Sequence, residues 1–474
     1  MNMKKTGMVF ALAVMASLLT ASFCRAMPKI TRLQLPNHLK LLVFEDHSIP
    51  AVTLKMLVAA GSSLETSSLE GLANLTANSL SLGTRSLSFD QINNKLDFMG
   101  ATYGVECTKD FVTIDMQVLK KDLAAGVSLF TEIVEHPVFP EDDLSLQKDE
   151  IIGELQEDED NPLKIADRAF NKALFRDSPY AGSVQGDQKS VQAITRVNLL
   201  KFYESYYRPN NAVLVIGGDI TPGEVKAKII PKLIGWNPGR IPKSAFKTPV
   251  AKDTAKVLID KPISQATIII GCSVMARSGA DYYPFLVLNQ ILGAGDLSSR
   301  LMTDIRTKSG LAYRVQSRLA AYKHAGSFQV VLQTRNGSAE QAMAQVQQEL
   351  ESLMHKPVSE EELKAAKQFL TGNFPLRYSM PGNFAKFLAE AEFYGLGPDY
   401  MQKYPALIDA VTAGDIQRVA MKYLATRCAV VIVGNIGKIK RADFSGPALP
   451  ALEKPAPGPV EKAPAAGPPK PAGK

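Results

Sequence analysis

The pattern of apolar and polar residues divides the chain into short strands and longer amphipathic helices. Short runs rich in Val, Ile and Leu are typical of strands, and apolar positions at helical spacing are typical of helices. In the first half of the chain this pattern predicts strands at 39–44, 52–58, 103–106, 111–118 and 212–217. It predicts helices from about residue 69 and at 121–134, 140–158, 163–174, 189–206 and 222–233.

The second half repeats the same order of elements. Strands are expected at 256–259, 266–272, 313–320, 327–333 and 429–433, and helices at 282–292, 338–354, 359–371 and 383–393. The closing strands of the two halves resemble each other, Val213-Leu-Val-Ile-Gly-Gly-Asp219 against Ala429-Val-Val-Ile-Val-Gly-Asn435. We therefore predict an α+β protein of two homologous halves, each an antiparallel-rich sheet covered by helices.

Composition sets the expected boundaries. Residues 1–26 place Lys4 and Lys5 before an apolar run that ends in small residues, as in a secretory signal peptide. The run is shorter than the ~20 residues that span a bilayer, which disfavours the alternative of a membrane anchor. We assign the first half to 27–235, a linker with Pro and Gly to 236–255, the second half to 256–445, and a disordered Pro/Ala-rich tail to 446–474.

Charge and cysteine content narrow the class of protein. Loss of the leader removes three positive charges and lowers the net charge from +7 to +4, so the basic balance does not indicate a nucleic-acid-binding protein. The leader predicts a secreted protein, periplasmic if the source is a Gram-negative bacterium. Cys107, Cys272 and Cys428 are far apart and have apolar neighbours, which favours buried free thiols. One disulfide remains the alternative.

The most informative motif is Gly71-Leu-Ala-Asn74-Leu-Thr-Ala77-Asn78-Ser-Leu-Ser-Leu-Gly83-Thr84. It resembles the zinc helix of the pitrilysin/insulinase/mitochondrial-processing-peptidase family of inverzincin-type metallopeptidases, which reads Gly-Leu-Ala-His-x-x-Glu-His-x-x-x-x-Gly-Thr. Asn74 and Asn78 stand at the two zinc-binding histidines, and Ala77 stands at the glutamate that activates water. A capping box from Ser67 to Glu70 is expected to start this helix.

These changes remove the chemistry that the resemblance would otherwise imply. Asn74 and Asn78 lie four apart on one helical face, but neutral amides are not the His, Cys or carboxylate donors of zinc sites. Ala77 cannot act as a general base. The family's third ligand falls by resemblance at Glu154, a vestigial position that is equally well explained as one carboxylate of an acidic helix. We therefore expect no metal and no catalytic residue in this chain.

A second motif closely resembles the corresponding segment of the family, including its arginine and tyrosine. The segment that carries it is Gly293-Ala-Gly-Asp-Leu-Ser-Ser-Arg300-Leu-Met-Thr-Asp-Ile-Arg306-Thr-Lys-Ser-Gly310-Leu-Ala-Tyr313. In the family, an arginine and a tyrosine at this spacing grip the substrate backbone and stabilise the polarised carbonyl. The resemblance implies that Arg306 and Tyr313 bind substrate, since a guanidinium and a phenol both donate to carbonyl oxygens. The alternatives are a surface arginine and a core tyrosine.

The resemblance covers nearly the whole chain after the leader and implies a divided active site. Some bacterial members of the family pair a chain that holds the zinc motif with a chain that holds the Arg/Tyr pair. We therefore expect a pseudoenzyme-like, substrate-binding subunit of a heterodimeric metallopeptidase. A homologous partner with an intact His-x-x-Glu-His motif would supply the zinc. A non-catalytic scaffold and, less favoured, a solitary metallopeptidase are the other hypotheses.

Overall fold

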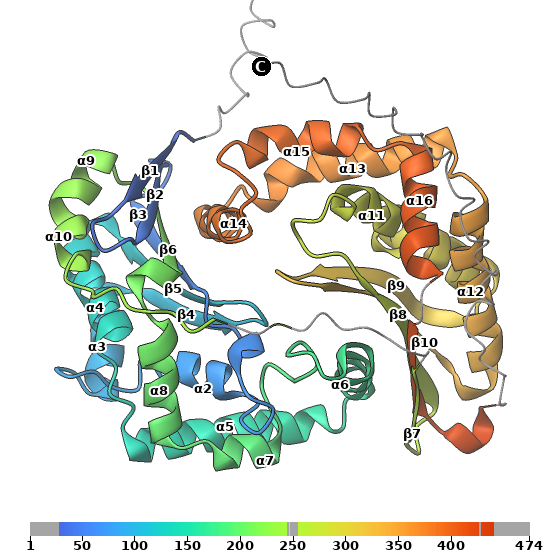
Figure 1. Cartoon of the computed structure of the whole chain (residues 1–474), viewed down its shortest axis with the longest axis horizontal. Helices are drawn as coiled ribbons and strands as arrows, with labels where there is room; N and C mark the ends of the chain where they lie inside the picture. Colours follow the sequence, from blue (N-terminus) through green and yellow to red (C-terminus); the bar gives the residue numbers. More distant parts are fainter. Residues whose placement is uncertain (1–27, 244–245, 247–254, 426–427, 440–474) are drawn as a thin grey trace, which may run out of the picture.

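The computed structural model describes residues 28–243, 246, 255–425 and 428–439. Two halves lie side by side, each with one twisted sheet (Figure 1). The predicted signal peptide and tail lie outside the described residues, as does part of the linker at 236–255. The domain bounds given above therefore stay predictions.

The first sheet has six strands in the order β1-β2-β6-β3-β5-β4. Only the pair β2–β6 is parallel, and the other four pairs are antiparallel. Its strands are β1 (Ile30–Gln34), β2 (Lys40–Glu45), β3 (Ala51–Val58), β4 (Thr102–Cys107), β5 (Val112–Leu119) and β6 (Ala212–Gly218).

The second sheet has five strands in the order β7-β11-β8-β10-β9, again with one parallel pair, β7–β11. This order repeats that of the first sheet without β1, so the prediction of two homologous α+β halves is confirmed. The strands are β7 (Ala255–Asp260), β8 (Gln265–Val274), β9 (Ala312–Ala321), β10 (Gly326–Arg335) and β11 (Cys428–Gly434).

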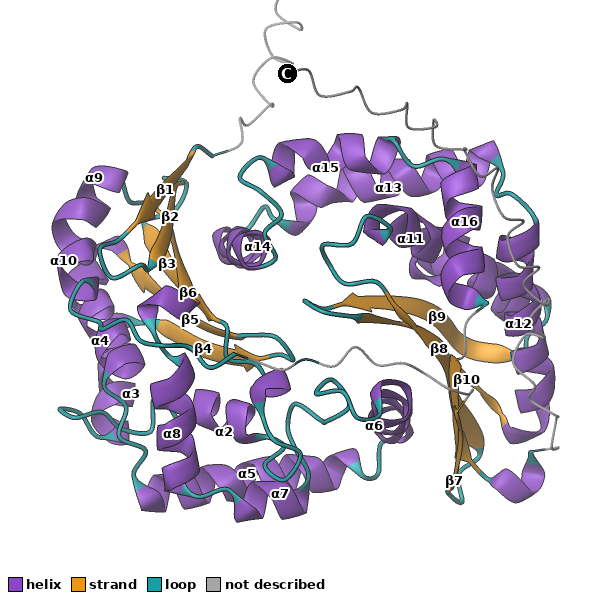
Figure 2. Cartoon of the chain, viewed as in Figure 1, coloured by secondary structure: helices purple, strands orange, loops and turns teal. Residues whose placement is uncertain are grey.

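Helices cover both sheets (Figure 2). The first half contributes α2 (Leu72–Asn78), α3 (Phe89–Met99), α4 (Leu123–Glu135), α5 (Glu141–Asp158), α6 (Pro162–Phe175), α7 (Gln188–Ala193), α8 (Arg196–Tyr206), α9 (Pro222–Glu224) and α10 (Ile230–Leu233). The second contributes α11 (Tyr282–Asn289), α12 (Ala339–His355), α13 (Glu360–Arg377), α14 (Pro381–Phe393), α15 (Tyr400–Asp409) and α16 (Ala413–Leu424). None of the described helices is long and apolar enough to cross a bilayer.

The two halves interlock, because each sends one helix to the sheet of the other. Helix α14 packs on β3 and β6 of the first sheet, and its Phe384 ring lies 4.8 Å from the ring of Phe44 on β2. Helix α6 packs in turn on β7, β8 and β11 of the second sheet. The central strands β3, β6 and β11 are therefore buried on both faces, which explains why they read as continuous apolar runs rather than as alternating ones.

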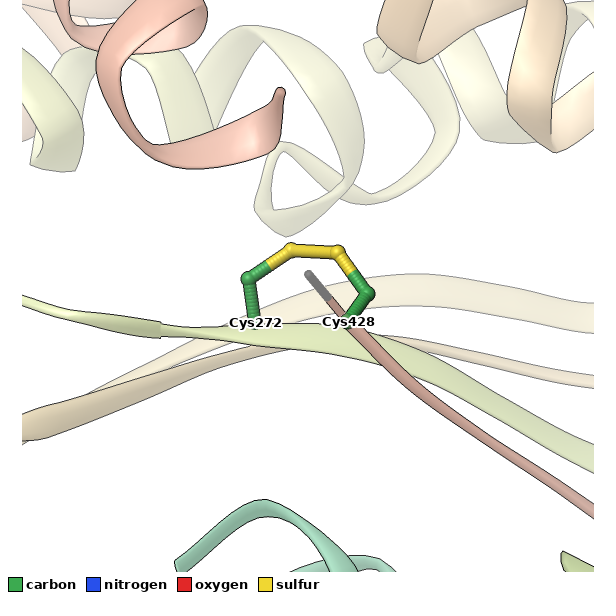
Figure 3. Close-up of a disulfide and its surroundings, with 2 residues drawn as sticks. All are labelled: Cys272 and Cys428. Atoms are coloured by element: carbon green, nitrogen blue, oxygen red, sulfur yellow. A yellow bond between two sulfur atoms is a disulfide. The ribbon is translucent and has the colours of Figure 1, made fainter. Parts of the chain in front are cut away.

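A disulfide joins Cys272 on β8 to Cys428 on β11 (Figure 3). The two residues lie directly opposite each other in the antiparallel β8–β11 pair, with their Cα atoms 4.4 Å apart. The expectation of three free thiols was therefore wrong for these two, because strand pairing brings together residues 156 positions apart. Cys107 is free and half-buried.

Candidate functional site

Helix α2 carries the altered zinc motif, and its start differs from the prediction. The helix begins at Leu72 and is not capped by the predicted Ser67–Glu70 box. Instead, the Glu65 carboxylate accepts hydrogen bonds from the backbone N–H groups of Gly71 (3.0 Å) and Ala73 (2.5 Å). Gly71 has φ +95°, and a Cβ there would lie 2.7 Å from the Gln185 carbonyl oxygen, so only glycine fits this turn.

Asn74 and Asn78 lie on one face of α2, as their spacing predicts, and they bind each other. The Asn78 amide nitrogen donates to the backbone oxygen of Asn74 (2.9 Å) and to its side-chain oxygen (3.1 Å). Ala77 is fully buried in the core of the first half. Two mutually bonded amides and a methyl group do not fit zinc, which takes imidazole, thiolate or carboxylate ligands. We therefore derive no metal chemistry from this helix.

Glu154 lies on α5, which packs against α2. Its side chain is exposed and accepts a hydrogen bond from the Gln185 amide at 3.2 Å. Among the described residues, no group of three or more His, Cys, Asp and Glu side chains is placed to hold a metal ion. Glu154 thus sits on a helix next to α2, but its observed contact is with an amide.

Arg306 and Tyr313 are brought together by a tight turn between a helix and a strand. Arg306 lies in the π-helical turn Met302–Lys308, and Tyr313 is the second residue of β9. The helix closes with bonds from Gly310 N–H to the Arg306 oxygen (3.1 Å) and from Leu311 N–H to the Ile305 oxygen (3.0 Å). Gly310 has φ +60°, a left-handed conformation that glycine adopts without strain.

A β-bulge then sets the direction of Tyr313. In the β9–β10 register Arg314 faces Gln333 and Ala312 faces Thr334, so Tyr313 has no residue opposite it. Such bulges redirect a side chain at the end of a strand. The Tyr313 ring is 77% exposed, and the Arg306 guanidinium carbon lies 5.4 Å from its centroid.

Both side chains line one open pocket of about 510 Å³ beside the edge strand β9. Every lining residue falls within 293–318, and none is acidic, whereas Arg314 and Arg318 add two further guanidinium groups. The structure thus unites Arg306 with Tyr313, and Asn74 with Asn78, but no residue of α2 lines the Arg306 pocket. The sequence analysis missed Arg314 and Arg318. The signal that was available is their spacing, because residues four apart on a strand lie on the same face.

The sequence analysis did not predict the polar contacts that join the two halves at Asp110. Asp110, in the β4–β5 turn, is buried and accepts hydrogen bonds from the hydroxyl groups of Tyr180 (2.5 Å) and Tyr394 (3.3 Å). It also accepts one from the backbone N–H of Lys323 at 2.7 Å. Lys323 and Tyr394 belong to the second half, so one carboxylate holds both halves.

Arg300, quoted above as part of the second motif, has a structural contact. Its guanidinium forms a bidentate ion pair with Glu362 at 2.7 and 2.9 Å, near the start of α13. Fold and site together therefore define a class: a two-half peptidase scaffold whose zinc helix lacks zinc ligands and whose Arg/Tyr pair shares a pocket.

Comparison with known proteins agrees with this class. The family model "Insulinase (Peptidase family M16)" matches residues 40–188, and "Peptidase M16 inactive domain" matches residues 193–370. The chain belongs to the insulinase and pitrilysin family of peptidases, M16.

Relatives and a solved structure extend the likeness over most of the chain. An uncharacterized zinc protease of Streptomyces coelicolor is 25% identical over 421 residues, or 86% of this chain and 90% of the relative. The non-peptidase homolog YmxG of Helicobacter pylori is 26% identical over 334 residues, or 70% of this chain and 77% of the relative. The crystal structure of a peptidase M16 inactive domain from Pseudomonas fluorescens has a TM-score of 0.80 and 26% identity, and covers 87% of this chain and 99% of that chain.

Proposed function

We propose that this chain is the substrate-binding subunit of an exported heterodimeric metallopeptidase. A homologous partner with an intact His-x-x-Glu-His motif would supply the zinc, the water and the general base. The observation that carries the proposal is the pairing of Arg306 with Tyr313 in one pocket, on a scaffold whose own α2 cannot hold zinc.

The chemistry of the pocket suits an extended peptide. Arg306 and Tyr313 present N–H and O–H donors beside an edge strand, and a peptide offers carbonyl oxygens as acceptors. The lining is free of acidic side chains, and of its three arginines Arg318 is paired with a carboxylate outside the lining, Asp167 at 3.8 Å. Donors aimed at a carbonyl that gains negative charge would stabilise the transition state of hydrolysis on the partner's zinc.

A scaffold protein with no part in proteolysis is the second candidate. It is favoured by the buried, packed state of Ala77 and by the name of the non-peptidase homolog among the relatives. On this view Arg306 and Tyr313 would contribute to no peptidase activity. The solitary metallopeptidase is disfavoured because Asn74 and Asn78 bind each other.

The test is to co-express the full chain with a candidate partner that carries His-x-x-Glu-His, and to measure peptide hydrolysis by the purified pair. We expect Arg306→Ala and Tyr313→Phe each to lower kcat/KM by about tenfold or more, because each removes a donor to a developing charge. Arg335→Ala, an exposed arginine at the end of β10, is the matched control and should leave the rate unchanged.

Two results would overturn the proposal. One is an active pair whose kcat/KM is indifferent to the double replacement of Arg306 and Tyr313. The other is the absence of any zinc-motif partner on purification from the native source, which would favour the scaffold function.

A further inference from the structure

A second, smaller pocket lies inside the second half, apart from the Arg306 site. It lies between helices α11, α13, α14 and α15, of which α14 is the one beside the first sheet (Figure 1). Its volume is about 150 Å³, and its walls are mainly aromatic. The tyrosines come from α11 and α15 and from the residues just after α13 and α14 (Tyr282, Tyr378, Tyr394, Tyr400 and Tyr404). The charged side chains that line it are Arg277, Arg377 and Glu390.

Arg277 is held rigidly in this wall. Its guanidinium carbon lies 3.9 Å from the centroid of the Tyr282 ring, and its Nη2 donates to the Tyr400 hydroxyl at 2.7 Å. Stacking on one ring and bonding to another fix the plane of the guanidinium. The group is thus positioned before any ligand arrives.

The other end of the same guanidinium has no acceptor. Nη1 of Arg277 is buried and makes no hydrogen bond, and within the described part of the chain Arg277 forms no ion pair. A buried donor of a charged group that is left unsatisfied destabilises the folded state. In native structures such groups are satisfied by a protein acceptor, an ordered water or a bound ligand.

Glu390 is the one carboxylate among the residues that line this pocket, and it does not fill the role. No ion pair joins it to Arg277 within the described residues, and burial raises its pKa above the ordinary value against the opposing effect of the Lys386 and Arg277 charges. Lys386, one helical turn before it, is engaged with Glu106 of the first half at 2.5 Å. Among the described residues no carboxylate pairs with Arg277, so an acid bound in the pocket would meet an unoccupied donor at Nη1.

We propose that this pocket binds a small aromatic or flat carboxylate, with its oxygens on Arg277 and its body among the tyrosine and phenylalanine rings. A carboxylate matches the planar fork of a guanidinium. The volume equals that of roughly five water molecules at ~30 Å³ each, which is enough for a single ring with its acid group but not for a peptide. The exposed Arg377 adds a second positive charge to the lining.

The experiment is calorimetric titration of the full chain with benzoate, and with benzamide as the neutral probe of the same shape. We expect benzoate to bind and benzamide to bind about tenfold more weakly or not at all, because the amide loses the charge-assisted bonds. Arg277→Met should lower benzoate affinity by about tenfold or more, whereas Arg335→Met, outside the pocket, should not.

Glu390→Gln is a second test variant, which keeps the proposal testable if Arg277→Met does not fold. It removes the negative charge that competes with the ligand while leaving Arg277 in place, so benzoate should bind it more tightly than the parent. Equal binding of benzoate and benzamide, or undiminished binding of benzoate to a folded Arg277→Met variant, would overturn the proposal. So would the absence of benzoate binding to both the parent and Glu390→Gln. None of these outcomes depends on a zinc partner, so the pocket and the proposed function fail separately.

Discussion

Replacing Asp110 tests how the two halves are joined. This buried carboxylate accepts the hydroxyl of Tyr180, the backbone N–H of Lys323 and, at a longer distance, the hydroxyl of Tyr394. We predict that Asp110→Ala destabilises the whole described fold, because the two halves lose their shared acceptor and three donors lose a partner.

The magnitude follows from these contacts. A hydrogen bond to a charged group contributes about 1.5–3 kcal/mol, and a buried donor left alone costs about 1–3 kcal/mol. Tyr180 has no exposed surface, so water cannot replace the lost carboxylate there. The desolvation cost of the carboxylate offsets part of this sum, and we expect a net loss of about 3–5 kcal/mol in the free energy of unfolding.

The assay is urea denaturation at equilibrium, read as the shift in midpoint at unchanged slope. The control is Asp399→Ala, whose carboxylate is 50% exposed and pairs with the exposed Lys403 at 2.6 Å. That exposed ion pair is expected to contribute about 1 kcal/mol or less. The reasoning is refuted if Asp110→Ala loses no more stability than Asp399→Ala.

Three further predictions concern the disulfide, acid stability and the metal helix. Replacing Cys272 and Cys428 together by Ala should lower the midpoint of urea unfolding, with a loop-entropy limit of about 5 kcal/mol for a closed loop of this length. The Asp281 carboxylate accepts hydrogen bonds from Arg418, Lys422 and the Tyr423 hydroxyl. Burial alone would raise its pKa, but these bonds prevail and lower the pKa from 3.8 to about 2. Asp281 therefore contributes about 2 kcal/mol to the free energy of unfolding above pH 4, and this contribution is lost as the pH falls towards 2. Acid titration of Asp281→Asn should lack this part of the pH dependence. The purified parent should hold less than stoichiometric zinc by metal analysis, and Asn74→His with Asn78→His should raise zinc affinity in titration, since two imidazoles would replace two amides.

Much of the fold was predictable because it depends on local pattern. The ten predicted strands and most of the predicted helices appear within a few residues of their expected bounds, since apolar runs and helical spacing are local signals. Strand β1 and helices α3, α15 and α16 were not predicted. The helix expected at 189–206 is instead two helices, because Thr195 starts a new one with a capping box to Asn198. The disulfide and the Asp110 junction join residues far apart in sequence, so no local pattern contains them.

The site shows the same division between what is local and what is not. The spacing of Arg306 and Tyr313 was visible in the sequence, but their closeness depends on the left-handed Gly310 and on a bulge that only the β10 register defines.

The altered zinc motif was also visible in the sequence, but the contribution of helix α2 to the stability of the fold was not. Leu75 and Ala77 of α2 are fully buried, and Glu65 caps the helix, so this segment now stabilises the first half by packing. A helix can lose its ligands without loss of the fold when its apolar face and its cap are kept. This is why a helix α2 with Asn74 and Asn78 in place of histidines is compatible with the pairing of Arg306 and Tyr313 in the other half.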